Sequence, residues 1–177
     1  MQVRKKISGI SAALVLILLI SACGGSNTSQ SNAPAETAGQ HAEHHESHTA
    51  ANGDLREATA SSDELPSFLD SKPEELVNVY RLAAEHSDLL DWIPCYCGCG
   101  TIAGHTSSRN CFIYEVQEDG TMVWDDHGTR CGTCLDIAFT AVMKQKEGLS
   151  VPEIRQFIEA RYAESGEPTP TPQYTGV

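Results

Sequence analysis

Three cysteines on alternate positions constrain this chain more than any other feature. Cys95, Cys97 and Cys99 lie within the short run from Pro94 to Gly100. If that run is extended, alternate residues point to the same side, so the three sulfurs would share one face. The packing of an ordinary core does not require such a pattern. We therefore expect the run to form part of a thiolate-rich site.

Three further cysteines follow at larger spacing: Cys111, Cys131 and Cys134. Two close groups of cysteines that are separated by a folded segment are typical of structural zinc sites, and soft thiolates also favour copper(I). His105 and His127 are additional candidates, so the chain offers more ligands than one tetrahedral ion needs. Either two ions share bridging thiolates, or four residues bind an ion and one cysteine pair is oxidised. The predicted metal ligands are Cys95, Cys97, Cys99, Cys111, Cys131, Cys134, His105 and His127.

Two other interpretations of these cysteines remain open. Outside the cytosol, six thiols would by default form three disulfides that hold a small interaction scaffold together. Alternatively, Cys131 and Cys134 have the spacing of a thiol-disulfide oxidoreductase, and a predicted helix N-terminus would stabilise a thiolate there. The surrounding pattern lacks the alternating strands and helices of a thioredoxin-like domain. Because phosphate-loop and hydrolase motifs are also missing, the sequence favours a binding module for copper(I) or zinc over an enzyme.

The start of the chain has the pattern of a targeting signal. Basic residues at positions 4–6 precede an apolar stretch over about residues 10–20, which is too short for a membrane span. The stretch ends in Ile20-Ser21-Ala22-Cys23, which resembles a bacterial lipobox. That resemblance implies cleavage after residue 22 and a diacylglyceryl group on Cys23, and two acyl chains anchor a protein stably. We expect a signal peptide at residues 1–22 and a lipoprotein on the cell membrane, facing outside the cytoplasm.

The charge of the chain limits its partners. The formal net charge is −12, and removal of residues 1–22 would leave 9 basic against 24 acidic residues, hence −15. Nucleic acid is therefore not an expected partner, because its binding requires Lys and Arg at the phosphates. Anionic lipid would also be repelled, so the lipid anchor alone must hold the protein at the membrane. The expected partners are the membrane and a protein that donates or accepts the metal ion.

Two segments lack the large apolar residues that a core needs. Residues 23–70 are rich in Ser, Ala, Glu and His, which predicts a disordered tether. Within this tether, four histidines form a short tract that can gather metal ions weakly. Residues 163–177 are rich in Pro and Thr, which predicts a disordered tail. The four histidines of the tether are His41, His44, His45 and His48.

Between these segments, residues 71–162 have the patterns of regular structure. Helices are predicted from about residue 71 to His86, from Cys134 to Gly148, and from Ser150 onward, where Ser150 and Glu153 form a capping box. Residues 112–116 and 121–124 predict a β-hairpin. The predicted fold is small and α+β, with about three helices and one β-hairpin around a Cys-rich loop. Domains of this size commonly use a metal ion or disulfides to reinforce a small core.

The cysteine motifs also resemble those of a known family. The segments are Pro94-Cys95-Tyr96-Cys97-Gly98-Cys99, then Gly104-His105, Asn110-Cys111-Phe112-Ile113, His127-Gly128 and Cys131-Gly132-x-Cys134. Together they are similar to the bacterial family named for its PCYCGC motif, over roughly residues 75–162. The family is described as lipoproteins without an established function. The resemblance thus supports the domain boundaries and the choice of residues, and implies no activity.

Overall fold

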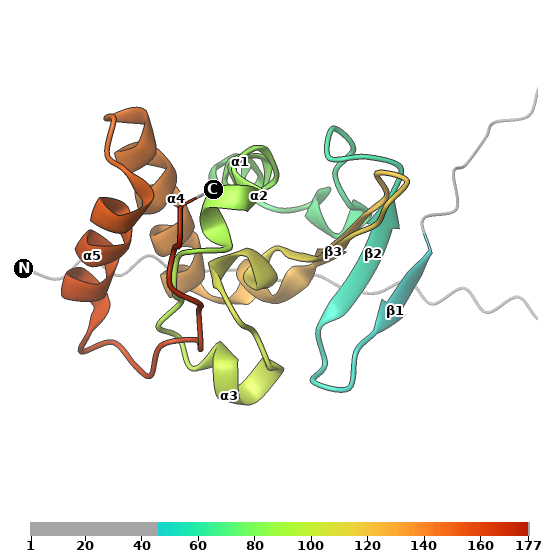
Figure 1. Ribbon diagram of the computed structural model, residues 1–177. Helices are drawn as coiled ribbons and strands as arrows, with labels where there is room; N and C mark the ends of the chain where they lie inside the picture. The colour runs from blue at the N-terminus through green and yellow to red at the C-terminus, as the bar shows by residue number, and fades with distance from the viewer. Residues whose placement is uncertain (1–45, 177) are drawn as a thin grey trace, which may run out of the picture. The chain divides into compact units, whose positions relative to one another are not determined.

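The structure is a computed structural model, and it describes residues 46–176. This part of the chain is α+β, which confirms the predicted fold class (Figure 1). Its strands form one antiparallel sheet in the order β1-β2-β4-β3. The strands are β1 (Ser47–Thr49), β2 (Leu55–Thr59), β3 (Ile113–Val116) and β4 (Met122–Asp125). The α-helices are α1 (Glu74–Glu85), α2 (Ser87–Leu90), α3 (Cys99–Ala103), α4 (Gly132–Lys146) and α5 (Val151–Tyr162). The short 3-10 helices are η1 (Ser67–Leu69), η2 (Ser108–Cys111) and η3 (Asp126–Arg130).

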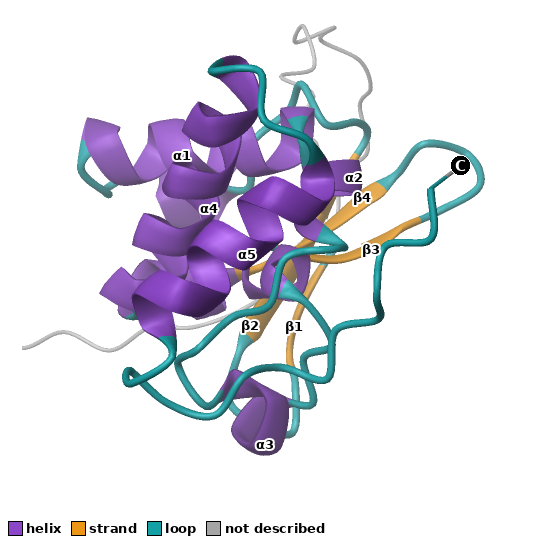
Figure 2. Cartoon of the chain, turned by 60° about the vertical axis from the view of Figure 1, so that its left-hand side comes forward, coloured by secondary structure: helices purple, strands orange, loops and turns teal. Residues whose placement is uncertain are grey.

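The three predicted helices correspond to α1, α4 and α5, which lie together beside the sheet (Figure 2). Helix α1 follows Pro73 and has two acidic residues in its first turn, where the helix dipole favours negative charge. Helix α5 begins with the predicted capping box of Ser150 and Glu153. Helix α4 lies between the other two and buries one face against them. Among the described residues, no helix is both long enough and apolar enough to span a membrane.

The core lies between the helices and the sheet, and aromatic residues form its centre. Tyr80 of α1 meets the ring of Phe112 edge-on, with the centroids 5.1 Å apart. Its hydroxyl donates a hydrogen bond of 2.9 Å to the backbone carbonyl of Asp125. Trp124 of β4 is also fully buried, and its indole N–H donates to the hydroxyl of Thr59. The predicted β3–β4 hairpin is thereby fixed to α1 and to the neighbouring strand β2.

Strand β2 lies in the segment that was predicted to be a disordered tether. It pairs with the edge of β4 that the hairpin leaves open, so the prediction is wrong for residues 46–70. The composition predicted disorder because few residues there are apolar, but β2 buries polar residues that form hydrogen bonds within the domain. Glu57, which is 2% exposed, accepts hydrogen bonds from the backbone N–H and the hydroxyl of Ser67. Residues 23–45 lie outside the described part of the chain. They include the lipidation candidate Cys23 and three of the four tether histidines. The fourth, His48, is exposed on β1.

The tail that was predicted to be disordered packs against the domain as far as Tyr174, whose ring meets that of Trp92 edge-on. Thr169 exchanges two hydrogen bonds with Cys95, because its N–H donates to the Cys95 carbonyl and its hydroxyl accepts from the Cys95 N–H. Arg155 of α5 donates to the backbone carbonyls of Thr171 and Pro172. The prolines of this segment stay exposed, while its threonine hydroxyls and backbone groups serve as buried hydrogen-bond partners. The predicted disorder is therefore wrong for the tail from residue 163 to residue 174.

Candidate metal centre

The loop after α2 carries the first cysteines, and a single glycine divides their run. Gly98 has a φ of +82°, a left-handed conformation that glycine adopts readily. The chain turns there and enters α3 at Cys99. Only Cys95 and Cys97 therefore lie on the same stretch of non-helical backbone. The prediction that all three sulfurs share one face of an extended run is wrong, because the third sulfur is carried by a helix.

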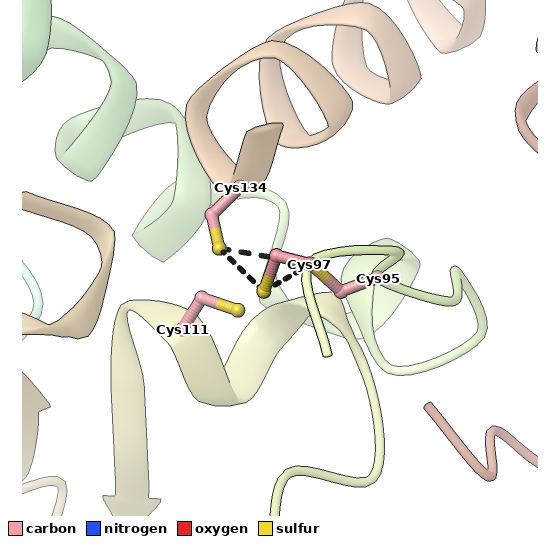
Figure 3. Close-up of side chains that lie close together, drawn as sticks. All are labelled: Cys95, Cys97, Cys111 and Cys134. Carbon is pink, nitrogen blue, oxygen red and sulfur yellow. Dashed lines mark hydrogen bonds between the residues drawn. The ribbon is translucent and has the colours of Figure 1, made fainter. Parts of the chain in front are cut away.

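Four sulfurs from three separate segments meet at one point (Figure 3). Cys95 and Cys97 come from the loop, Cys111 from the end of η2, and Cys134 from the first turn of α4. The Sγ–Sγ distances are 3.5 Å between Cys95 and Cys97, 3.6 Å between Cys95 and Cys134, and 3.4 Å between Cys97 and Cys134. All four sulfurs lie within 4.8 Å of one another. We call Cys95, Cys97, Cys111 and Cys134 the four-sulfur group.

The spacing of this group matches that of a metal site better than that of disulfides. A tetrahedral ion with Zn–S bonds of about 2.3 Å holds its sulfurs roughly 3.8 Å apart, whereas a disulfide needs about 2.05 Å. All six described cysteines are free thiols in this structure. Three of the group are fully buried, and only Cys97 is partly exposed. The group therefore has the size and the shielding of a closed tetrathiolate site.

A second set of ligand atoms lies directly beside the four-sulfur group. Cys99 Sγ is 3.8 Å from Cys111 Sγ, which is in turn 3.5 Å from His105 Nδ1. These three atoms lie within 4.8 Å of one another. His127 forms another such group with Cys97 and Cys99, and its ring meets that of His105 edge-on with the centroids 4.7 Å apart. The structure thus brings together seven of the eight predicted ligands.

Cys131 is the predicted ligand that the structure leaves out. It belongs to none of the candidate metal groups among the described residues. It is the N-cap of α4 and has extended backbone angles, with φ −133° and ψ 105°. Two residues three positions apart share a face of a helix only when both are helical. Because Cys131 is not helical, its side chain does not share the face from which Cys134 contacts the other sulfurs. Cys134 instead contacts Cys95 and Cys97.

Comparison with known proteins agrees with the cysteine pattern. Residues 12–174 match the model of a family described as "Protein of unknown function with PCYCGC motif". The chain belongs to this family. No curated protein and no solved structure matches the chain. Family membership thus covers the PCYCGC loop, both sets of ligand atoms and the packed tail, and it carries no activity with it.

The sulfurs around the PCYCGC loop strongly influence one another's protonation. Hydrogen bonds from Cys111 and Cys134 lower the pKa of Cys95 to about 4, and they lower the pKa of Cys97 as well. The pKa of Cys111 is raised, with Cys134 as the main cause and Cys95, Cys97 and Cys99 after it. The reason is that one thiolate is stabilised by thiols that donate to it, while further anions beside it would repel one another. A cation in the group would remove this repulsion and bind the thiolates directly.

The two histidines differ in charge and in support. Burial lowers the pKa of His105 to about 4, so at neutral pH its ring is uncharged and can act as a ligand. The contact with Cys97 raises the pKa of His127. His127 Nδ1 also lies 3.2 Å from a carboxylate oxygen of Asp54, which in turn accepts from Arg130. A carboxylate behind a ligating imidazole orients the ring.

Asp54 is a residue that sequence reasoning missed, because it lies in the segment predicted as a tether. It is 2% exposed and follows the β1–β2 turn. The signal that could have found it is Asn52-Gly53, since Asn-Gly is the strongest short-range indication of a hairpin. Gly53 does adopt the positive φ that such a turn requires.

Proposed function

We propose that this protein binds a soft metal ion, zinc or copper(I), through Cys95, Cys97, Cys111 and Cys134. The observation that carries the proposal is the convergence of four sulfurs from three chain segments, three of them 3.4–3.6 Å apart and all four within 4.8 Å of one another. Thiolates select soft ions, and an all-sulfur tetrahedral arrangement favours zinc first. A structural disulfide would instead require pairs of sulfurs at bonding distance.

The exposure of the group supports a role in holding the ion and passing it on. Cys95, Cys111 and Cys134 are shielded by the core, so solvent ligands do not compete for an ion bound there. Cys97 is partly exposed, so an incoming thiolate can replace it first. The protein would then buffer the ion or exchange it with a donor or acceptor protein. The lipobox resemblance at Cys23 supports a place for this exchange on the outer side of the cell membrane.

Metal uptake by the full-length mature chain tests the proposal. We expect the protein, reduced and kept free of oxygen, to bind Zn(II) or Cu(I) stoichiometrically in native mass spectrometry. Cobalt(II), used as a probe for zinc, should give intense thiolate-to-metal absorption. Cys134→Ser should weaken binding by more than about 100-fold, because changes outside the ligand set already cost 10–100-fold.

Cys131→Ser provides the matched control, since it is the same substitution three residues away and outside the groups. It should leave metal affinity unchanged. Absence of uptake by the reduced protein would overturn the proposal, and so would equal losses in the two variants. An unreduced intact mass that is six hydrogens below the reduced value would also overturn it, and would indicate a disulfide scaffold.

A further inference from the structure

The ligand atoms around the PCYCGC loop exceed what one ion can use. Beside the four-sulfur group lie Cys99, His105 and His127, none of which belongs to it. A tetrahedral ion that is bound by four thiolates has no free position for them. Their arrangement therefore requires its own explanation.

His105 points to a second ligand. Its side chain is only 4% exposed, and its Nε2 has no hydrogen-bond partner among the described residues. A buried polar atom without a partner costs about 1–3 kcal/mol, so most native examples have a protein, water or ion partner. The other ring nitrogen, Nδ1, lies 3.5 Å from Cys111 Sγ. The ring is thus buried at the sulfur cluster with one nitrogen unsatisfied.

Cys99 supplies a second sulfur at the same place. Its Sγ lies 3.8 Å from Cys111 Sγ, close to the roughly 3.8 Å edge expected of a tetrahedral thiolate site. Cys99 is 1% exposed. Its position is fixed by the turn at Gly98, which places it in α3 rather than on the run that carries Cys97. The turn therefore places this sulfur beside Cys111, within 4.8 Å of both Cys97 Sγ and a ring nitrogen of His105.

Charge also favours a second ion. A single divalent cation bound by the four thiolates of the first group, with Cys99 left as a thiol, would leave two uncompensated negative charges in a largely buried place. Buried charges are expensive unless they are paired. Two divalent cations bound by all five thiolates would leave one, which the nearby partly exposed His127 and solvent at Cys97 can accommodate.

We propose that the protein binds a second divalent ion such as zinc beside the first, through Cys99, His105 and Cys111, with the Cys111 thiolate bridging both ions. Cys111 is the residue that the two groups have in common. Three protein ligands leave one position open, which is typical of zinc sites that exchange a ligand. His127 borders this position, with its ring held by Asp54. This inference rests on the proposed function, since the bridging thiolate belongs to the first site.

Counting bound ions separates the two proposals. Native mass spectrometry of the full-length mature chain with Zn(II) should show two ions on the wild type and one on His105→Asn. Cys99→Ser should also bind one, which provides a second variant should either substitution disturb folding. His86→Asn is the matched control, because His86 caps α1 and belongs to no candidate metal group among the described residues; it should bind two.

Each outcome of the count decides one proposal. No ion on the wild type overturns both, whereas one ion on the wild type and on His105→Asn overturns only the second site. The bridge has its own readout, since two Co(II) ions that share a thiolate couple magnetically. The electron paramagnetic resonance intensity per cobalt should fall when the second equivalent is added. Two bound ions with additive intensity would overturn the bridge.

Discussion

Thr169→Val tests whether the C-terminal tail holds the first cysteine of the PCYCGC loop in place. The substitution keeps the shape of the side chain and removes its hydroxyl. That hydroxyl accepts a hydrogen bond of 2.9 Å from the backbone N–H of Cys95, a fully buried residue, and forms another of 2.8 Å with the Thr171 hydroxyl. A buried N–H that loses its acceptor costs about 1–3 kcal/mol. We expect the free energy of unfolding to fall by about 2 kcal/mol.

Urea unfolding of the full-length protein, at equal metal content in all variants, measures this loss. With a slope of about 2 kcal/mol per molar urea, the midpoint should fall by about 1 M while the slope stays unchanged. Thr175→Val makes the same chemical change at an exposed position of the same tail and should leave the midpoint within about 0.2 M. Equal midpoints for the two variants would refute the reasoning, because they would mean that the tail does not pack on Cys95.

Three further predictions concern packing, pH and metal. Gly128→Ala would place a methyl group 2.7 Å from the Phe112 ring and should destabilise the protein by about 1–3 kcal/mol, whereas Gly132→Ala meets nothing within 4 Å and should be nearly neutral in thermal unfolding. Glu153→Gln should destabilise α5 at neutral pH but not in acid. Hydrogen bonds from Ser150 lower the pKa of Glu153. The Glu153 carboxylate therefore contributes to folding stability above about pH 4.5, and this contribution is lost as the pH falls through the folded-state pKa. A pH-independent difference in urea midpoint would contradict this. Removal of bound metal by a chelator should lower the melting temperature, since a ligand at 100 times its dissociation constant contributes about 2.7 kcal/mol, and an unchanged melting temperature would count against a bound ion.

The two segments with the least apolar sequence both support the candidate site. The β1–β2 turn contributes Asp54, which lies against His127. The tail contributes Thr169, which fixes the backbone of Cys95. Both contacts are hydrogen bonds between buried polar groups. They hold the Cys95 backbone and the His127 ring in position without burying apolar surface.

The sequence by itself determined the elements whose signals are local. Apolar residues at helical spacing and end caps predicted α1, α4 and α5, and alternating residues around a Gly-containing turn predicted the β3–β4 hairpin. The cysteine motifs indicated the family and nearly all candidate ligands. These features depend on residues within a few positions of one another, so one segment carries the whole signal.

Only the tertiary structure decided the features that depend on distant partners. Strand β2 forms because it pairs with the free edge of β4 and because the buried Glu57 accepts a hydrogen bond from Ser67. The composition of the segment indicates neither interaction. The division of the cysteines has the same origin. The turn at Gly98 places Cys99 in α3, near His105. The backbone of Cys131 is extended, and its thiol belongs neither to the four-sulfur group nor to the group of Cys99, His105 and Cys111. The sequence does not show which of the six cysteines bind together, because the path of the backbone between them decides which sulfurs lie close to one another.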